Sequence, residues 1–217
     1  MEMHTIKVRL TFLEEILGTA SNNPAIHSEF IASKAPDHMK REEEVAAIGV
    51  EESIEKSMTV FPRDEAGNPI LFDYQIKGFF KDACGMLRIV PGTKSSKLTA
   101  FKKKIDGLVF VSPRMIPLTI PTDAKQGNCE RPLRAQTAQG DRVALANSET
   151  APAGTTIEFE IQCLTKDMVP IVREWLDYGI LRGIGQWRNS GKGKFQWDEI
   201  DGDTGEIIGG NIVEHLI

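Results

Sequence analysis

The segment that most constrains the fold runs from residue 155 to residue 198, where three patterns follow one another. Residues 155–163 alternate apolar and polar side chains, which predicts a β-strand with one buried face. Residues 167–178 have apolar side chains at helical spacing, with Asp167 as the expected N-cap. A segment with five glycines follows, at positions 179, 183, 185, 191 and 193, and residues 194–198 then predict another strand. The chain must therefore accommodate a strand–helix–glycine-rich loop–strand unit.

The rest of the chain supplies the elements of an α+β protein. Residues 5–12 alternate apolar and polar side chains and predict another half-buried strand. Residues 74–88 have the apolar stripe of an amphipathic helix. Short strands are expected over 107–111 and 115–120, the second at a sheet edge because of its prolines. Residues 122–154 predict a long hairpin or arm.

The order of these elements indicates the fold class. Strand, helix, strand or strands, strand, helix, strand is the split βαβ, ferredoxin-like arrangement, which is also the topology of RRM-type RNA-recognition sheets. We expect one domain over residues 1–217, with insertions at about 13–58 and 122–150. Residues 37–57 are acidic and are expected to be helical in part.

The distribution of charge is compatible with a polyanionic ligand although the net charge is −5. Residues 77–104, which include a Lys/Ser/Thr-rich segment at 93–104, hold eight basic residues and one acidic residue, Asp82. Residues 182–194 hold four basic residues and no acidic one. A polyanion responds to the local field rather than to the total charge. A solvated protein face has the same composition, so charge alone leaves both interpretations open.

Several classes of function find no support in the residue types. No apolar run approaches the roughly 20 residues that span a bilayer, and no signal-peptide core opens the chain, so we expect a cytoplasmic protein without membrane contact. The three cysteines lie far apart and predict free thiols rather than disulfides or a zinc site. The four histidines lack metal-ligand spacing, and no serine-nucleophile elbow occurs. We expect no cofactor, no metal and no catalytic residue.

The glycine-rich loop has the residue types of a phosphate-binding site. Its glycines permit positive φ and close approach of a ligand, so that several N–H groups can point at a phosphate. Its arginines and lysine add charge, and Trp187 offers a stacking face for a base. The candidate residues in this loop are Arg182, Gly183, Gly185, Trp187, Arg188, Gly191, Lys192 and Gly193. The alternative is that the loop needs its glycines only for packing.

The helix at 74–88 adds a second candidate surface. Lys77 and Lys81 lie one helical turn apart and can face one strand of backbone phosphates, and Gly78 between them would allow close approach. The basic surface continues through Arg88, Lys94 and Lys97. The alternative for these lysines is a solvated helix face.

Three segments, which follow one another along the chain in the order of the family, resemble the RAMP proteins of CRISPR effectors, particularly the Cas7 group of backbone subunits. Residues 183–195 resemble the glycine-rich loop and closing strand of that family. Residues 152–161, preceded by Glu149, resemble its Pro-x-Gly-Thr strand. Residues 64–69 followed by 75–81 resemble its segment that enters a helix through Lys-Gly, although Tyr74 and Gln75 replace the usual serine pair. Residues 13–58 do not match.

The resemblance implies a single RAMP-like domain that binds RNA along a grooved surface. It also implies a thumb-like arm that lies across a guide RNA, with Arg131 and Arg134 as candidate contacts. Family members of type III cut target RNA with a loop aspartate, but no equivalent can be placed in this sequence. No nuclease residue is therefore carried over.

Three hypotheses follow. The first is a non-catalytic RAMP protein that binds guide RNA phosphates through the basic helix and the glycine-rich loop. It would self-assemble along RNA, with copies of itself or other CRISPR effector subunits as partners. The second is a solitary phage or mobile-element RAMP-like protein that inserts into, or inhibits, a CRISPR surveillance complex. The third is a RAMP endoribonuclease, which would need a His/Tyr/Lys centre or a loop aspartate.

Overall fold

The computed structural model describes residues 3–22, 58–137 and 140–211, and it describes their side chains except for those of residues 133–145. Sheet A has five antiparallel strands in the order β12-β11-β1-β10-β6. These strands are β1 (His4–Phe12), β6 (Val109–Ser112), β10 (Thr156–Cys163), β11 (Phe195–Ile200) and β12 (Ile207–Gly210). The alternation in residues 5–12 and 155–163 therefore predicts two adjacent strands, which pair with Val8 opposite Phe159.

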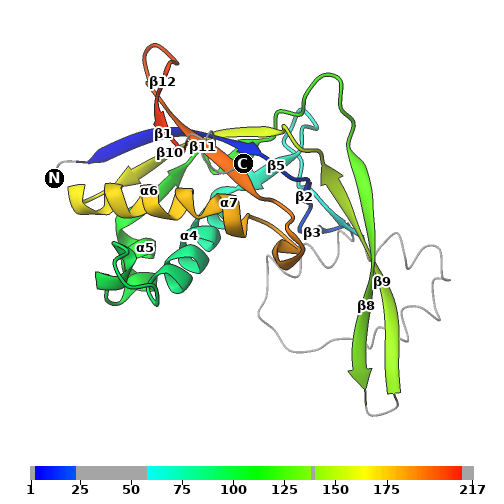
Figure 1. Ribbon diagram of the computed structural model, residues 1–217. Helices are drawn as coiled ribbons and strands as arrows, with labels where there is room; N and C mark the ends of the chain where they lie inside the picture. The colour runs from blue at the N-terminus through cyan, green and yellow to red at the C-terminus, as the bar shows by residue number, and fades with distance from the viewer. Residues whose placement is uncertain (1–2, 23–57, 138–139, 212–217) are drawn as a thin grey trace.

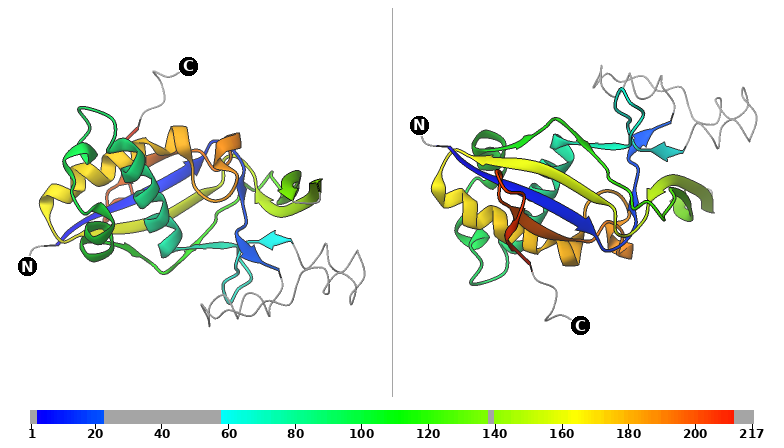
Figure 2. Two further views of the ribbon diagram at one scale, coloured as in Figure 1. Left: turned by 90° about the horizontal axis from the view of Figure 1, so that it is seen from below. Right: turned by 90° about the horizontal axis from the view of Figure 1, so that it is seen from above.

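Four helices cover one face of sheet A (Figure 1). They are α4 (Asp73–Leu87), α5 (Phe101–Leu108), α6 (Val169–Asp177) and α7 (Gly179–Arg182). The core lies between these helices and the sheet, where the ring of Phe79 contacts Phe195 at 5.1 Å and the ring of Phe80 contacts Trp175 at 5.5 Å between centroids. Seen from above in Figure 2, the opposite face of the sheet carries no helix from the described part of the chain.

A long hairpin extends from the body of the protein (Figure 1). It consists of β8 (Gly127–Thr137) and β9 (Gly140–Ala151), paired from Gly127 opposite Thr150 to Thr137 opposite Gly140. Both strands belong to sheet B, in which β9 also pairs in the order β2-β9-β4-β3 with β2 (Ile16–Leu17), β3 (Ala20–Ser21) and β4 (Thr59–Val60). A separate pair joins β5 (Ile70–Phe72) to β7 (Met115–Pro117). The hairpin predicted over 122–154 is confirmed.

Some local predictions are wrong. The strand expected over 107–111 begins at Val109, because Gly107 and Leu108 complete α5. The Lys/Ser/Thr-rich segment at 93–104, for which no element was predicted, contains a short 3-10 helix, η1 (Ser95–Lys97), and the first turn of α5. Asp167 is not the cap of α6: residues Lys166–Met168 form a 3-10 turn, η2, that leads into the helix without a side-chain cap bond. The helix expected within 37–57 lies outside the described residues.

The carboxylate of Glu149 fixes the base of the hairpin to the body. Its Oε2 accepts the N–H of Phe61 at 2.9 Å, and its Oε1 accepts a bond from Gln126 at 3.0 Å and forms an ion pair with Arg63. The residue is 8% exposed, so these bonds satisfy a buried charge. The acidic residue that precedes the Pro-x-Gly-Thr strand thus links three segments at the root of the arm.

We expect the substitution Glu149→Gln to lower the free energy of unfolding by about 2 kcal/mol, because it weakens buried charge-assisted bonds. The loss should concentrate at the arm, which hydrogen exchange resolves as faster exchange in residues 127–151. A matched control is Glu158→Gln on the open face of sheet A, where the ion pair with Arg9 is exposed. Equal effects of the two substitutions would contradict the assignment.

The three cysteines differ in how deeply they are buried. Burial raises the pKa of the Cys163 thiol to about 11 and also raises the pKa of Cys84, whereas Cys129 on β8 is partly exposed.

No helix in the described part of the chain is long and apolar enough to cross a membrane.

We expect one thiol per native chain to react quickly with iodoacetamide at about pH 8, and three after unfolding, because the thiolate is the nucleophile. Mass spectrometry should place the fast adduct on Cys129. Because the folded pKa of Cys163 lies above the ordinary value of 9.0, stability should decline as the pH rises from about 9 towards 11. Rapid labelling of Cys163 in the native chain would contradict this burial.

Candidate nucleic-acid interface

The two segments predicted to bind RNA lie together, and Asp82 joins them. Its Oδ2 accepts bonds from Arg182 Nε at 2.8 Å and from Arg188 Nη1 at 2.7 Å. Arg182 also donates through Nη1 to Asn189 Oδ1 at 2.8 Å. The bond to Asp82 is the main cause that raises the pKa of Arg182. One acidic residue of α4 therefore orients two arginines from the glycine-rich loop.

Two glycines close the neck of that loop. The N–H of Ile184 donates to the Gly193 carbonyl at 2.9 Å, and the N–H of Gly193 donates to the Glu15 carbonyl at 2.9 Å. A Cβ on Gly193 would lie 2.0 Å from the Ile184 oxygen, and a Cβ on Gly183 would lie 2.7 Å from the Gly193 carbonyl. Both residues also have positive φ, +68° and +73°. For these two positions, the packing explanation of the glycines holds.

The other loop residues have different surroundings. Gly185 and Gly191 have φ of +86° and +85°, but a Cβ on either would clash with no backbone. Glycine is favoured at these two positions because of the positive φ, and not because a side chain would lack space. Lys192 forms an ion pair with Glu15, and this bond is the main cause that raises the lysine pKa. The ammonium group of Lys192 therefore already has an acidic partner.

Lys77 and Lys81 both face α5. Lys77 Nζ donates to the Asp106 carbonyl at 3.2 Å, and Lys81 Nζ forms an ion pair with Asp106 Oδ1 at 2.6 Å. The ammonium of Lys77 also lies 5.2 Å from the centre of the Phe110 ring. The pair thus shares one surface, as the helical spacing predicts, but one carboxylate of α5 partly neutralises it.

The strip of α4 that adjoins these lysines points to the glycine-rich loop. Tyr74, Gly78 and Asp82 follow one another at i, i+4 and i+8, so they share one side of the helix. Tyr74 is 55% exposed and its ring stacks on Phe72 at 5.3 Å. A Cβ on Gly78 would meet nothing within 4 Å, so no described protein atom approaches this bare stretch of helix. We call Tyr74, Gly78, Asp82, Arg182 and Arg188 the α4–loop surface.

Two glutamines hold this surface to the segment at 18–19. Gln75 Oε1 accepts the N–H of Phe72 at 2.7 Å, which starts α4, and its Nε2 donates to Thr19 Oγ1 at 2.8 Å. Gln186 Nε2 donates to the Gly18 carbonyl at 3.0 Å. Gln75, which departs from the serine of the family pattern, therefore has a positioning role. Sequence reasoning missed Gln186 and Tyr74, and it treated Asp82 only as a lone opposing charge.

The remaining sequence-predicted basic residues occupy separate places. Arg88 lies over the Phe101 ring at 4.9 Å, and Lys94 and Lys97 are exposed. Glu174 of α6 orients the latter segment, because its carboxylate accepts the N–H groups of Lys94 at 2.6 Å and Ser95 at 2.9 Å. Arg131, at the base of the arm, contacts the glycine-rich loop, whereas the side chain of Arg134 lies outside the described part.

On its open face, sheet A presents charged side chains along its two central strands, and its exposed ring, Phe110, lies on the edge strand β6. The outward side chains of its two central strands, β1 and β10, include Lys7 and Arg9 beside Glu158 and Glu160. Arg9 donates to Glu158 at 2.8 and 2.6 Å. RRM sheets present aromatic rings at such positions. This face is therefore not favoured as the RNA surface.

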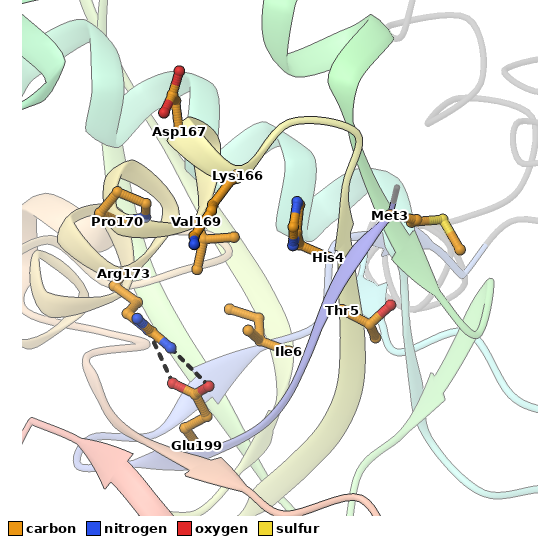
Figure 3. A pocket seen from close by; sticks show the side chains of 10 residues that line it. All are labelled: Met3, His4, Thr5, Ile6, Lys166, Asp167, Val169, Pro170, Arg173 and Glu199. Atoms are coloured by element: carbon orange, nitrogen blue, oxygen red, sulfur yellow. Dashed lines mark hydrogen bonds and ion pairs between the residues drawn. The ribbon is translucent and has the colours of Figure 1, made fainter. Parts of the chain in front are cut away.

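A hollow of about 790 Å³ lies at the N-terminal end of β1, between that strand and α6 (Figure 3). Two of its charged residues neutralise each other, because Arg173 donates two bonds of 2.9 Å to Glu199. The glycine-rich loop adjoins the opposite end of β1, since Leu13 and Glu15 bond to it. The nine residues of β1 span about 30 Å, so this hollow is separate from the α4–loop surface. No group of three potential metal-ligating side chains occurs among the residues that the structure describes.

Comparison with solved structures finds chains with a similar arrangement of elements. A chain in the cryo-EM structure of the type III-B Cmr-beta complex bound to cognate target RNA matches with a TM-score of 0.54 and 13% sequence identity. The match covers 97% of this chain and 60% of that chain, so this chain spans less than two thirds of its length. Cmr6 from Pyrococcus furiosus matches with a TM-score of 0.42 and 10% identity, over 90% of this chain and 98% of that one.

No family model matches the sequence, and no curated protein matches it either. At 13% identity the first match shows a shared fold, not a shared function. The mixed α+β architecture with several sheets is consistent with the RAMP resemblance of the three sequence segments.

Proposed function

We propose that this chain is a non-catalytic RNA-binding protein of the RAMP type, similar to the Cas7 backbone subunits. The observation that carries the proposal is the joining of α4 to the glycine-rich loop through Asp82, which gathers two arginines beside a bare helix face. The shared fold with a chain from an RNA-bound type III-B complex supports it. No residue is assigned a catalytic role.

The proposed RAMP-type fold has a ferredoxin-like unit at its centre. Its chain order is β1, α4, β6, β10, α6, β11, and its sheet order is β11-β1-β10-β6. We assign these elements to the split βαβ arrangement, with β12 added at one edge. The hairpin β8–β9 is inserted between the two halves of this unit, where family members have a thumb.

The proposed RNA path crosses the α4–loop surface and continues to the base of the arm. Arg182 and Arg188 outnumber the single carboxylate of Asp82, so the cluster keeps a net positive charge. A phosphate at this point can accept bonds from guanidinium N–H groups that Asp82 has already oriented. Guide RNA is the proposed ligand, and copies of this chain or other effector subunits are the proposed neighbours along it.

Size-exclusion chromatography of the purified chain tests this proposal. We expect a peak larger than a monomer that absorbs as nucleic acid as well as protein, and that shrinks after ribonuclease treatment. Added single-stranded RNA should restore the larger peak at low salt and lose it at high salt, since phosphate contacts release counterions. A monomer that never comigrates with RNA at low salt would contradict the proposal.

Exposed apolar side chains support a second candidate function, that of an interaction protein which docks on an effector complex. Ile89 is 78% exposed, Leu181 is 68% exposed and Val90 is 47% exposed, at the ends of α4 and α7. Apolar side chains of this kind are enriched at the core of protein interfaces. Capture of effector subunits without RNA, abolished by Ile89→Glu with Leu181→Glu, would favour this candidate over the first.

A further inference from the structure

The junction between the arm and the glycine-rich loop contains an unusual pair of side chains. The guanidinium of Arg131, on β8, lies 4.9 Å from the centre of the Trp187 ring. Arg131 is only 7% exposed, yet its one side-chain hydrogen bond among the described residues runs from Nη2 to Gln186 Oε1, at 2.7 Å. Its Nη1 is buried and has no hydrogen-bond partner in that part of the chain. The ring face of Trp187 thus provides a cation–π contact to this buried guanidinium.

Trp187 itself adopts a costly conformation. Its φ is +55°, a region that non-glycine residues seldom occupy, and it is 38% exposed. The surrounding contacts hold it there: Gln186, the preceding residue, bonds both to Arg131 and to the Gly18 carbonyl. Backbone strain of this kind persists where neighbouring structure imposes it, and it is enriched at binding sites. The strain presents a large ring at the surface instead of burying it.

We propose that Trp187, supported by Arg131, is a stacking platform for one unpaired nucleobase. The guanidinium covers one face of the indole, and the base would stack on the opposite face of this residue, which is 38% exposed as a whole. Stacking on an aromatic ring requires an unpaired base, because a base within a duplex already has neighbours on both faces. The platform therefore selects single-stranded RNA over duplex RNA. This inference rests on the proposed RNA-binding function and adds a base contact to its phosphate contacts.

The position of the platform gives it a second consequence. Arg131 belongs to the arm and Trp187 to the glycine-rich loop, so the stack connects two segments that are far apart in sequence. A base on the indole would complete a layer of cation, ring and base. The arm and the loop should therefore become more protected from hydrogen exchange together when RNA binds.

The tryptophan content of the chain provides a direct probe. Trp175 and Trp197 are 0% and 3% exposed, so a ligand that contacts tryptophan at the surface must act on Trp187. We would titrate the full chain with a uridine oligomer of about 12 nucleotides and with an abasic oligomer of the same length. We expect the uridine oligomer to quench the emission and to bind about tenfold more tightly than the abasic one.

Two variants separate the base contact from a general effect. Trp187→Asn removes the ring but retains a residue that tolerates positive φ, and we expect it to lose most of the preference for uridine over the abasic oligomer. Trp187→Phe keeps a ring and should retain the preference in part. If Trp187→Asn does not fold, the quenching of the unsubstituted chain decides the question.

The outcomes distinguish the two proposals. Equal affinity of the unsubstituted chain for both oligomers, without quenching, would overturn the stacking platform and leave RNA binding in place. An unchanged preference in Trp187→Asn would also overturn it. Failure of the chain to bind either oligomer would overturn the proposed function and, with it, the platform.

Discussion

Replacement of Gly193 by alanine is expected to lower the free energy of unfolding by about 4 kcal/mol. A left-handed backbone costs a non-glycine residue about 1–2 kcal/mol, and Gly193 has φ of +68°. The added Cβ would also lie 2.0 Å from the Ile184 oxygen, so the bond between Ile184 and Gly193 must break or the neck of the loop must open. Because the same neck bonds to Glu15, the damage should reach sheet A through the segment after β1.

Gly205 provides a matched control for Gly193. It has φ of +73°, but a Cβ there would meet nothing within 4 Å. The substitution Gly205→Ala should therefore cost only about 1 kcal/mol, the conformational part. Urea denaturation of the two variants measures the difference in midpoint. Equal destabilisation would show that the close packing at the neck contributes nothing.

Substitution of Arg182 and Arg188 together by glutamine is expected to weaken binding of single-stranded RNA about 30-fold at about 50 mM salt, at roughly 1 kcal/mol for each lost contact. The slope of affinity against salt should fall by about 0.7 for each lost phosphate contact. The double substitution also leaves Asp82 without either partner, so an unopposed carboxylate would face the RNA. Adding Asp82→Asn to it should therefore recover part of the lost affinity.

A control pair lies on the open face of sheet A. Lys7→Gln with Arg9→Gln removes the same amount of positive charge, and Arg9 too is engaged in an ion pair. We expect this pair to leave the salt slope unchanged and to reduce affinity less than threefold or so, through the general field alone. Fluorescence anisotropy with labelled RNA measures both variants. Equal losses would show that charge acts without regard to position and would remove the argument for the α4–loop surface.

Periodicity made most of the main elements of the fold predictable. Alternation in 5–12 and 155–163 indicates strands because one face of each lies against the same core, and both Val8 and Ile161 are fully buried. The stripe of α4 was equally clear. The helix α5 was missed although Phe101, Ile105 and Leu108 have helical spacing, because three consecutive lysines obscure so short an apolar stripe. The formation of α5 and β12 depends on tertiary packing, which the local sequence pattern does not record.

The candidate site was predictable in its parts but not in its arrangement. The glycine-rich loop and the Lys-Gly helix were both identified, but nothing in the sequence shows that Asp82 faces Arg182 across a separation of 100 residues. Nor could spacing alone show that Asp106 would compete for Lys77 and Lys81, since α5 was not predicted. The pair of Arg131 and Trp187 depends on where the arm leaves the body, which is a property of sheet B.

Photochemical cross-linking is the most direct test of where RNA binds. The full chain would be irradiated with a single-stranded RNA that contains thiouridine, and the linked peptides would be identified by mass spectrometry. We expect cross-links at Tyr74 and Trp187, the exposed rings of α4 and of the glycine-rich loop. Cross-links confined to the open face of sheet A, around Arg9 and Phe110, would contradict the proposed interface.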